Sequence, residues 1–100
     1  MKERILKIQL SNRRAKKYMA VVSDGTSKRN IHFGAKGWGQ WKDSTLLRAY
    51  KGSDHGDPER RRRYFLRHSG VPSKREAIAR EVRRSRGRYT AKLLSHRYLW

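Results

Sequence analysis

The positive charge of this chain is the feature that most restricts how it can fold. Its 27 Lys and Arg residues against 8 Asp and Glu give a formal net charge of +19, and like charges repel in a compact state unless something neutralises them. Leu, Ile, Val and Phe make up only 18 of the 100 residues, a composition typical of disordered chains. Aromatic residues, 10% of the sequence, offset this because each one buries a large area. We therefore expect one small domain, residues 1–100, that binds an anionic partner.

Several kinds of site are excluded or disfavoured by the sequence. It contains no cysteine, so disulfides and Cys-ligated zinc are excluded. Only the segment Asp54-His55-Gly56-Asp57 places acidic residues beside a histidine, and Asp57 fits better as a helix cap. We predict no catalytic residue, no metal site, no cofactor and no small-molecule substrate. Apolar runs are at most two or three residues, and residues 1–10 lack the apolar block of a signal peptide, so we expect no membrane insertion.

The first third of the chain, residues 1–34, is predicted to form strands. Leu6, Ile8 and Leu10 alternate with polar residues, which is the period of a strand with one buried face. Similar patterns follow, with a turn at Asp24-Gly25. Because the connections are short, they favour an antiparallel meander. We expect strands at about 5–10, 16–23 and 28–33.

Residues 57–100 are predicted to form Arg-rich helices and an aromatic tail. Asp57-Pro58 has the sequence of a helix start, Gly70 is a suitable stop, and Ser73 begins a capping box. We expect helices over about 57–69, 73–87 and 89–100. The fold class is therefore α+β, a small three-stranded antiparallel meander followed by two or three helices. The expected core residues are Tyr18, Val22, Phe33, Tyr64, Phe65, Ile78, Val82 and Leu94.

Between these parts, residues 35–56 form a glycine- and tryptophan-rich loop and an insertion. Leu46 and Leu47 could begin one helical turn that ends at Tyr50. Trp38 and Trp41 could stack on bases or bind a partner. Because aliphatic residues are so few, packing of both indoles in the core is the favoured interpretation.

Arginines of the helical region give the densest charge. No acidic residue occurs between Arg60 and Arg67, whereas a solvated helix face usually mixes both signs. Arginine also binds phosphate bidentately, so phosphate is the favoured ligand over mere solvation of a charged face. The predicted nucleic-acid-binding residues are Lys36, Arg60, Arg62, Arg63, Arg67, Arg80, Arg83, Arg84, Arg86 and Arg88.

Several segments resemble a family of small basic proteins encoded by large nucleocytoplasmic DNA viruses and their relatives. The most specific are Phe-Gly-Ala-Lys-Gly at 33–37, Asp-Pro-Glu-Arg at 57–60 and the ending Leu99-Trp100. The similarity covers nearly the whole chain. Two departures are Trp38-Gly39-Gln40-Trp41, where a Tyr-containing acidic loop would be expected, and residues 44–56, which look like an insertion. The resemblance implies a viral origin, and a location in the virion or, during infection, in host cytoplasm or nucleus.

These observations predict a non-enzymatic virion protein that binds and neutralises packaged duplex DNA without regard to sequence. The alternative is a minor capsid or cement protein, whose cations meet other virion proteins such as capsid proteins and whose aromatic tail anchors in a neighbour. A third possibility is an accessory factor in replication or transcription, although no recognition helix is evident. The tail could equally fold back onto the chain's own core. The predicted partner-binding residues are Trp38, Trp41, Tyr98, Leu99 and Trp100.

Overall fold

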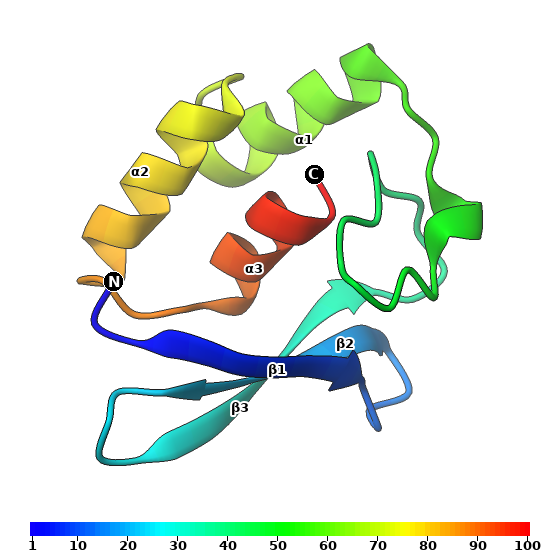
Figure 1. The fold of residues 1–100 in the computed structure, drawn as a ribbon. Coiled ribbons are helices and arrows are strands. Elements are labelled where there is room, and N and C mark those ends of the chain that lie inside the picture. The colour runs from blue at the N-terminus through cyan, green and yellow to red at the C-terminus, as the bar shows by residue number, and fades with distance from the viewer.

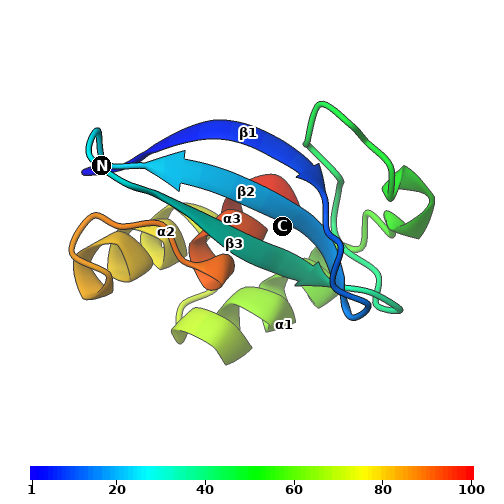
Figure 2. The same ribbon diagram turned by 90° about the horizontal axis from the view of Figure 1, so that it is seen from below.

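The computed structural model describes residues 1–100 and has two layers, a three-stranded sheet and three helices that cover one of its faces (Figure 1, Figure 2). The strand order is β1-β2-β3 and both pairs are antiparallel. This confirms the α+β fold class predicted from the sequence. The elements are β1 (Arg4–Leu10), β2 (Lys16–Ser23), β3 (Lys28–Ala35), the short 3-10 helix η1 (Lys51–Ser53), α1 (Pro58–Ser69), α2 (Lys74–Arg84) and α3 (Ala91–Tyr98).

The central strand β2 supplies much of the buried face of the sheet. Tyr18, Ala20 and Val22 are fully buried, and Tyr18 lies opposite Phe33 of β3. These positions alternate along the strand, as the period of a half-buried strand requires. The core of the domain therefore lies between this face and the helices.

Strand β1 differs from the expected alternation. Its register against β2 shifts between Ile5 and Lys7, so one extra residue is inserted and the side chains beyond it change face. Ile5 and Ile8 pack against the core, whereas Leu6 and Leu10 are exposed. The prediction of a buried face formed by Leu6, Ile8 and Leu10 is therefore wrong for the two leucines.

The three helices begin at capping side chains. Asp57 accepts hydrogen bonds from the backbone N–H of Glu59 (3.0 Å) and Arg60 (3.3 Å). Ser73 caps α2 and Thr90 caps α3 in the same manner. Helix α1 ends at Gly70, which has a positive φ of 73°, a conformation that glycine adopts at little cost. The helix boundaries predicted from these caps are confirmed within a few residues.

Helices α3 and α1 provide most of the helical core. Leu93, Leu94 and Leu99 are fully buried with the sheet residues, and Tyr64 and Phe65 of α1 form a second cluster with Ala77 of α2. In α2 the buried residues are Ala77 and Glu81. The prediction that α2 buries Ile78 and Val82 is correct only in part, because both are half-buried.

The segment between the sheet and α1 is held by polar side chains. The fully buried Asp43 accepts hydrogen bonds from the hydroxyl of Tyr18, from Thr45 and from the backbone N–H of Tyr50. The predicted helical turn at Leu46–Tyr50 is not formed, and the short helix lies at Lys51–Ser53 instead. Side-chain bonds to Asp43 thus replace helical bonds in this segment.

No helix in the structure is long and apolar enough to span a bilayer.

Candidate nucleic-acid interface

The acidic residues of the chain are largely used inside the fold. Glu3, Asp43 and Glu81 are buried. Glu3 accepts two hydrogen bonds of 2.8 Å from Arg29 and one from the backbone N–H of Tyr89. These bonds from Arg29 hold the pKa of Glu3 below its ordinary value, although burial acts in the opposite direction. Glu3 and Glu81 each pair with one arginine, so they are not available to the other cations of the surface.

Few of the surface cations are neutralised within the chain. The ion pairs are Arg29 with Glu3, Arg62 with Glu59 and Arg84 with Glu81. The other lysines and arginines have no carboxylate side chain within 4.0 Å. Because surface charges of one sign raise the local concentration of counter-ions, this surface is suited to a polyanion.

One large cavity is lined by several of these lysines and arginines. Its volume is about 720 Å³, and it lies between α1, α3, the adjoining ends of β2 and β3, and the loop that follows β3. Aromatic rings of Tyr64 and Trp100 line it as well, and no Asp or Glu does. We call this cavity the basic groove. The cations that line it are Lys16, Lys17, Arg60, Arg63, Arg67 and Lys92.

One face of α1 forms a wall of the basic groove. Arg60, Arg63 and Arg67 follow one another at helical spacing, and all three are exposed. From Arg60 to Arg67 the helix rises about 10 Å, similar to the roughly 10 Å that three nucleotides span along one strand of B-DNA. The row can therefore face successive phosphates of a single strand.

Burial lowers the pKa values of two titratable groups in the basic groove. Partial burial lowers the pKa of His68, and the neighbouring Arg67 and Lys92 lower it further. Burial also lowers the pKa of Lys17, although Asp43 and Asp54 act in the opposite direction. His68 is thus uncharged at neutral pH, and the charge of the groove comes from its lysines and arginines.

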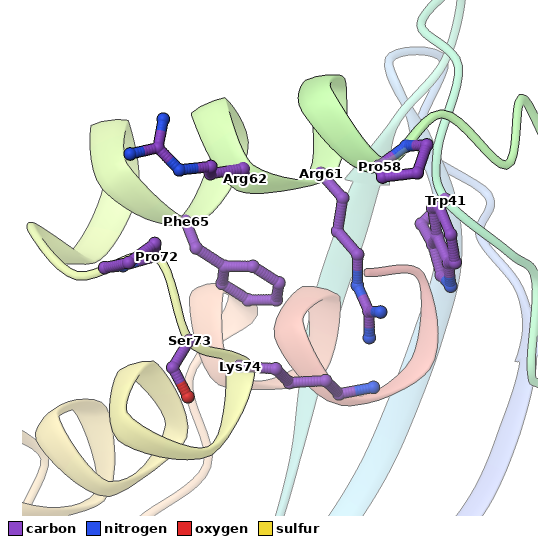
Figure 3. A pocket seen from close by; sticks show the side chains of 8 residues that line it. All are labelled: Trp41, Pro58, Arg61, Arg62, Phe65, Pro72, Ser73 and Lys74. Atoms are coloured by element: carbon purple, nitrogen blue, oxygen red, sulfur yellow. The ribbon is translucent and has the colours of Figure 1, made fainter.

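The remaining predicted cations lie outside the basic groove. Arg62 lines a second cavity of about 370 Å³ at the starts of α1 and α2, where Figure 3 shows Arg61 extending from α1 beside Trp41. Lys36 is exposed in the loop after β3. The cations predicted on α2 and the turn after it, which do not line the groove, are Arg80, Arg83, Arg84, Arg86 and Arg88.

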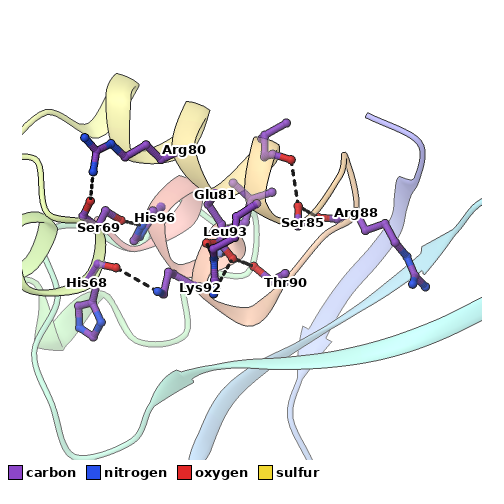
Figure 4. A network of polar contacts seen from close by, with 12 residues as sticks. His68, Ser69, Arg80, Glu81, Ser85, Arg88, Thr90, Lys92, Leu93 and His96 are labelled. Carbon is purple, nitrogen blue, oxygen red and sulfur yellow. Dashed lines mark hydrogen bonds and ion pairs between the residues drawn. The ribbon is translucent and has the colours of Figure 1, made fainter.

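Two of the α2 arginines are occupied by contacts within the chain. Arg80 donates to the backbone oxygen of Ser69 at 3.2 Å, and Arg84 donates two hydrogen bonds to Glu81. Figure 4 shows Arg80 reaching Ser69, with Glu81 beside Thr90. The ten predicted cations therefore do not form one surface, and only Arg60, Arg63 and Arg67 share the groove.

The three tryptophans have different surroundings. Trp100 stacks on Tyr64 with ring centroids 4.1 Å apart, and Trp41 lies under the guanidinium of Arg61 at 4.6 Å. Trp38 is 72% exposed. The prediction that Trp38 packs in the core is wrong, because the sheet and α3 fill the core with other side chains.

The C-terminal residues fold back onto the chain itself. Leu99 is buried in the main core and Tyr98 packs against it, while the backbone oxygen of Trp100 accepts a hydrogen bond from Arg61 at 2.9 Å. Of the two alternatives for this segment, the structure shows packing on its own core. The side chain of Leu99 has no surface left for a neighbour in this conformation.

The acidic segment at residues 54–57 has structural roles. Asp54 accepts hydrogen bonds from the side chain of Gln40 and the backbone N–H of Asp43, and Asp57 caps α1. Nδ1 of His55 accepts from the backbone N–H of Asp57 at 3.0 Å. These bonds occupy both carboxylates and Nδ1 of His55, whereas Nε2 of His55 is buried without a hydrogen-bond partner.

Among the basic residues that line the groove, sequence reasoning missed three lysines and one histidine, namely Lys16, Lys17, Lys92 and His68. Lys92 reaches the backbone oxygen of His68 at 3.0 Å and thereby connects α3 to α1. Local patterns contain no signal for such residues, because the fold brings them together from separate elements.

Comparison with known proteins gives one match. Residues 6–41 match a model described as a family of unknown function (DUF5754). The matched segment contains most of β1, all of β2 and β3, and Trp38, and it ends before α1. No curated protein and no solved structure matches the chain.

Proposed function

We propose that this chain is a non-enzymatic protein that binds nucleic acid through the basic groove and neutralises packaged viral DNA. The observation that carries the proposal is that six lysines and arginines line one cavity that no Asp or Glu lines. Lysine and arginine contacts to phosphates supply most of the affinity of sequence-indifferent DNA binding. The row of Arg60, Arg63 and Arg67 supports a duplex strand lying along α1.

The viral setting is part of the same proposal. It rests on the resemblance of residues 33–37 and 57–60 to small basic proteins of large DNA viruses, together with a net charge of +19 that a packaged polyanion would neutralise. Fractionation of purified particles would test this part. Recovery with the DNA-containing core is expected, whereas recovery with the outer shell would favour the role as a minor capsid protein.

The binding itself is tested by titrating a labelled mixed-sequence duplex at several salt concentrations. Log K should fall linearly with log salt, with a slope of about −0.9 for each phosphate neutralised. The double variant Arg63→Ala, Arg67→Ala should flatten this slope by about 2. Both residues are exposed, so the fold should be retained.

A matched control removes the same charge elsewhere. Arg83 and Arg86 are exposed and do not line the groove, so Arg83→Ala with Arg86→Ala should change the slope much less. Equal effects of the two double variants would show that binding is spread over the whole surface. Binding that ignores salt would contradict the proposal altogether.

A further inference from the structure

Trp38 has an exposed ring that nothing in the chain explains. It is 72% exposed, whereas Trp41 and Trp100 are half-buried and have a cation or a ring against them. In a chain with so few large apolar residues, an unburied indole forgoes a substantial gain from the hydrophobic effect. Such a ring is suited to a ligand with a flat apolar face.

The backbone that carries Trp38 is fixed on both sides. Its carbonyl oxygen accepts a hydrogen bond of 2.7 Å from Nζ of the buried Lys17. Two residues later, the backbone N–H of Gln40 donates to Ser53 and its carbonyl accepts from His55. A ring on a fixed backbone loses little conformational entropy when it binds, which favours affinity.

Trp38 lines the basic groove together with the arginines of α1. The same cavity therefore offers an aromatic face and a row of cations, the combination with which proteins bind single-stranded nucleic acid. Its volume of about 720 Å³ lies within the range of about 300–1,000 Å³ typical of small-ligand pockets. That size suits one or a few nucleotides.

We propose that the basic groove holds unpaired nucleotides, with one base stacked on Trp38 and the adjoining phosphates bound by Arg60, Arg63 and Arg67. This inference rests on the proposed nucleic-acid binding and adds which form of the ligand enters the groove. A base inside a duplex has both faces covered by its neighbours, so an indole can stack only on a base that is unpaired, terminal or flipped out.

Base identity is not read by Gln40, whose amide side chain lines the groove together with Trp38. The amide of Gln40 is occupied within the fold, because its Nε2 donates to Asp54 and to the backbone oxygen of Tyr50. Its Oε1 accepts a hydrogen bond from Lys17. Stacking without such an amide contact tolerates any base, so the contact with Trp38 requires that a base be unpaired but does not depend on which base it is.

The test compares a short oligothymidylate with a duplex of the same length in the full chain. Trp38→Ala should weaken oligothymidylate binding by roughly 5- to 100-fold, the range expected for loss of one stacked base, and should change duplex binding little. Leu46→Ala is the matched control, since Leu46 is a fully exposed apolar residue that does not line the groove. It should bind both ligands like the parent.

Fluorescence identifies which tryptophan meets the base. Oligothymidylate should quench the tryptophan fluorescence of the parent protein. The Trp38→Phe variant should lose this quenching but keep part of the affinity for oligothymidylate. A quench that persists in Trp38→Phe, or equal oligothymidylate affinity of the parent and Trp38→Ala, would overturn the inference.

The two proposals fail in different ways. Salt-dependent duplex binding that requires Arg63 and Arg67, with no effect of Trp38→Ala on oligothymidylate, would leave the proposed function standing and refute the role of Trp38. Equal weakening of single-strand and duplex binding by Trp38→Ala would also refute stacking on an unpaired base. If neither ligand binds, both proposals are wrong.

Discussion

Helices α1 and α2 are both rich in arginine, yet their cations have different fates. The buried side of α1 is aromatic, with Tyr64 and Phe65, so Arg60, Arg63 and Arg67 find no carboxylate and remain free beside the groove. The buried side of α2 contains Glu81, which binds Arg84 and accepts from Thr90 at 2.7 Å. The buried carboxylate of Glu81 thus holds one arginine of α2, whereas no buried carboxylate lies on α1 to hold Arg60, Arg63 or Arg67.

The attachment of the two helices to α3 differs in the same way. Helix α1 is attached to α3 by the neutral imidazole ring of His96. Its Nδ1 lies 2.8 Å from the hydroxyl oxygen of Tyr64, and its Nε2 lies 2.7 Å from the hydroxyl oxygen of Ser69. Helix α2 is held by the ionised Glu81 through Thr90. Acid should therefore weaken the attachment of α1 at a higher pH than that of α2.

The largest expected effect is a loss of stability between neutral pH and about pH 4. Burial lowers the pKa of His96 to about 4. The charge of Glu81 acts in the opposite direction, whereas those of His68, Lys92 and Lys74 lower the pKa further. The unfolded chain takes up this proton near pH 6.5. The stability that neutral His96 contributes is therefore fully present above that pH and is lost as the pH falls toward the folded-state pKa. The expected loss in the free energy of unfolding is on the order of 3 kcal/mol. Urea unfolding at pH 7, 6 and 5 measures the slope.

A substitution of His96 distinguishes its contribution to the pH dependence of stability from that of the other histidines. His96→Phe should be less stable at pH 7, because Tyr64 and Ser69 lose a partner, and its stability should depend less on pH. Some slope remains, since burial also lowers the pKa values of His55 and His68. If the slope equals that of the parent, His96 is not the group that titrates.

The carboxylates of the two helices form a second test. Glu81 is buried, so Glu81→Ala should cost about 2–3 kcal/mol, because it leaves the Thr90 hydroxyl without its acceptor and Arg84 without its pair. Glu59 of α1 lies 4.0 Å from Arg62, with both side chains exposed, so Glu59→Ala should cost less than about 0.5 kcal/mol. Chemical denaturation measures both, and equal costs would remove the contrast drawn between the helices.

Ligand binding should stabilise the chain through α1 and not through α2. An anionic ligand at about ten times its Kd raises the free energy of unfolding by about 1.4 kcal/mol. Thermal melts with oligothymidylate should show this gain in stability in the parent protein and in the double variant Arg83→Ala, Arg86→Ala. The gain should be smaller in Arg63→Ala, Arg67→Ala at the same ligand concentration. An equal gain in both variants would mean that the ligand does not use the groove.

Elements defined by neighbouring residues were predictable from the sequence. The strands follow from alternation, and α1 follows from Asp57-Pro58 at its start and Gly70 at its end. Leu6 was misassigned because a one-residue bulge shifts the register without leaving a local signal. Leu10 lies opposite Tyr18, beyond the bulge, and is exposed at the last position of β1. Glu81 was not expected inside because burial of a carboxylate depends on partners such as Thr90, nine residues away.

The basic groove was predictable only in part. The row of Arg60, Arg63 and Arg67 follows from helical spacing, but Lys16 and Lys92 join it because β2 and α3 meet there. The exposure of Trp38 could not be read from composition, which favours a buried indole. It depends on the path of the loop after β3, where Lys17 of β2 binds the carbonyl oxygen of Trp38 and the side chain of Gln40.

The smallest expected effect concerns the caps that set where the two helices begin. Asp57 accepts two N–H bonds, at 3.0 and 3.3 Å, and its negative charge lies at the positive end of α1. Asp57→Ala should therefore cost about 1 kcal/mol. Ser73 makes one bond of 3.5 Å to the N–H of Glu76, at the limit of hydrogen-bond length, so Ser73→Ala should cost about half as much. Urea unfolding at fixed salt measures the difference. If Ser73→Ala costs more than Asp57→Ala, the start of α2 is fixed more firmly than that of α1, and the contrast between the helices does not extend to their caps.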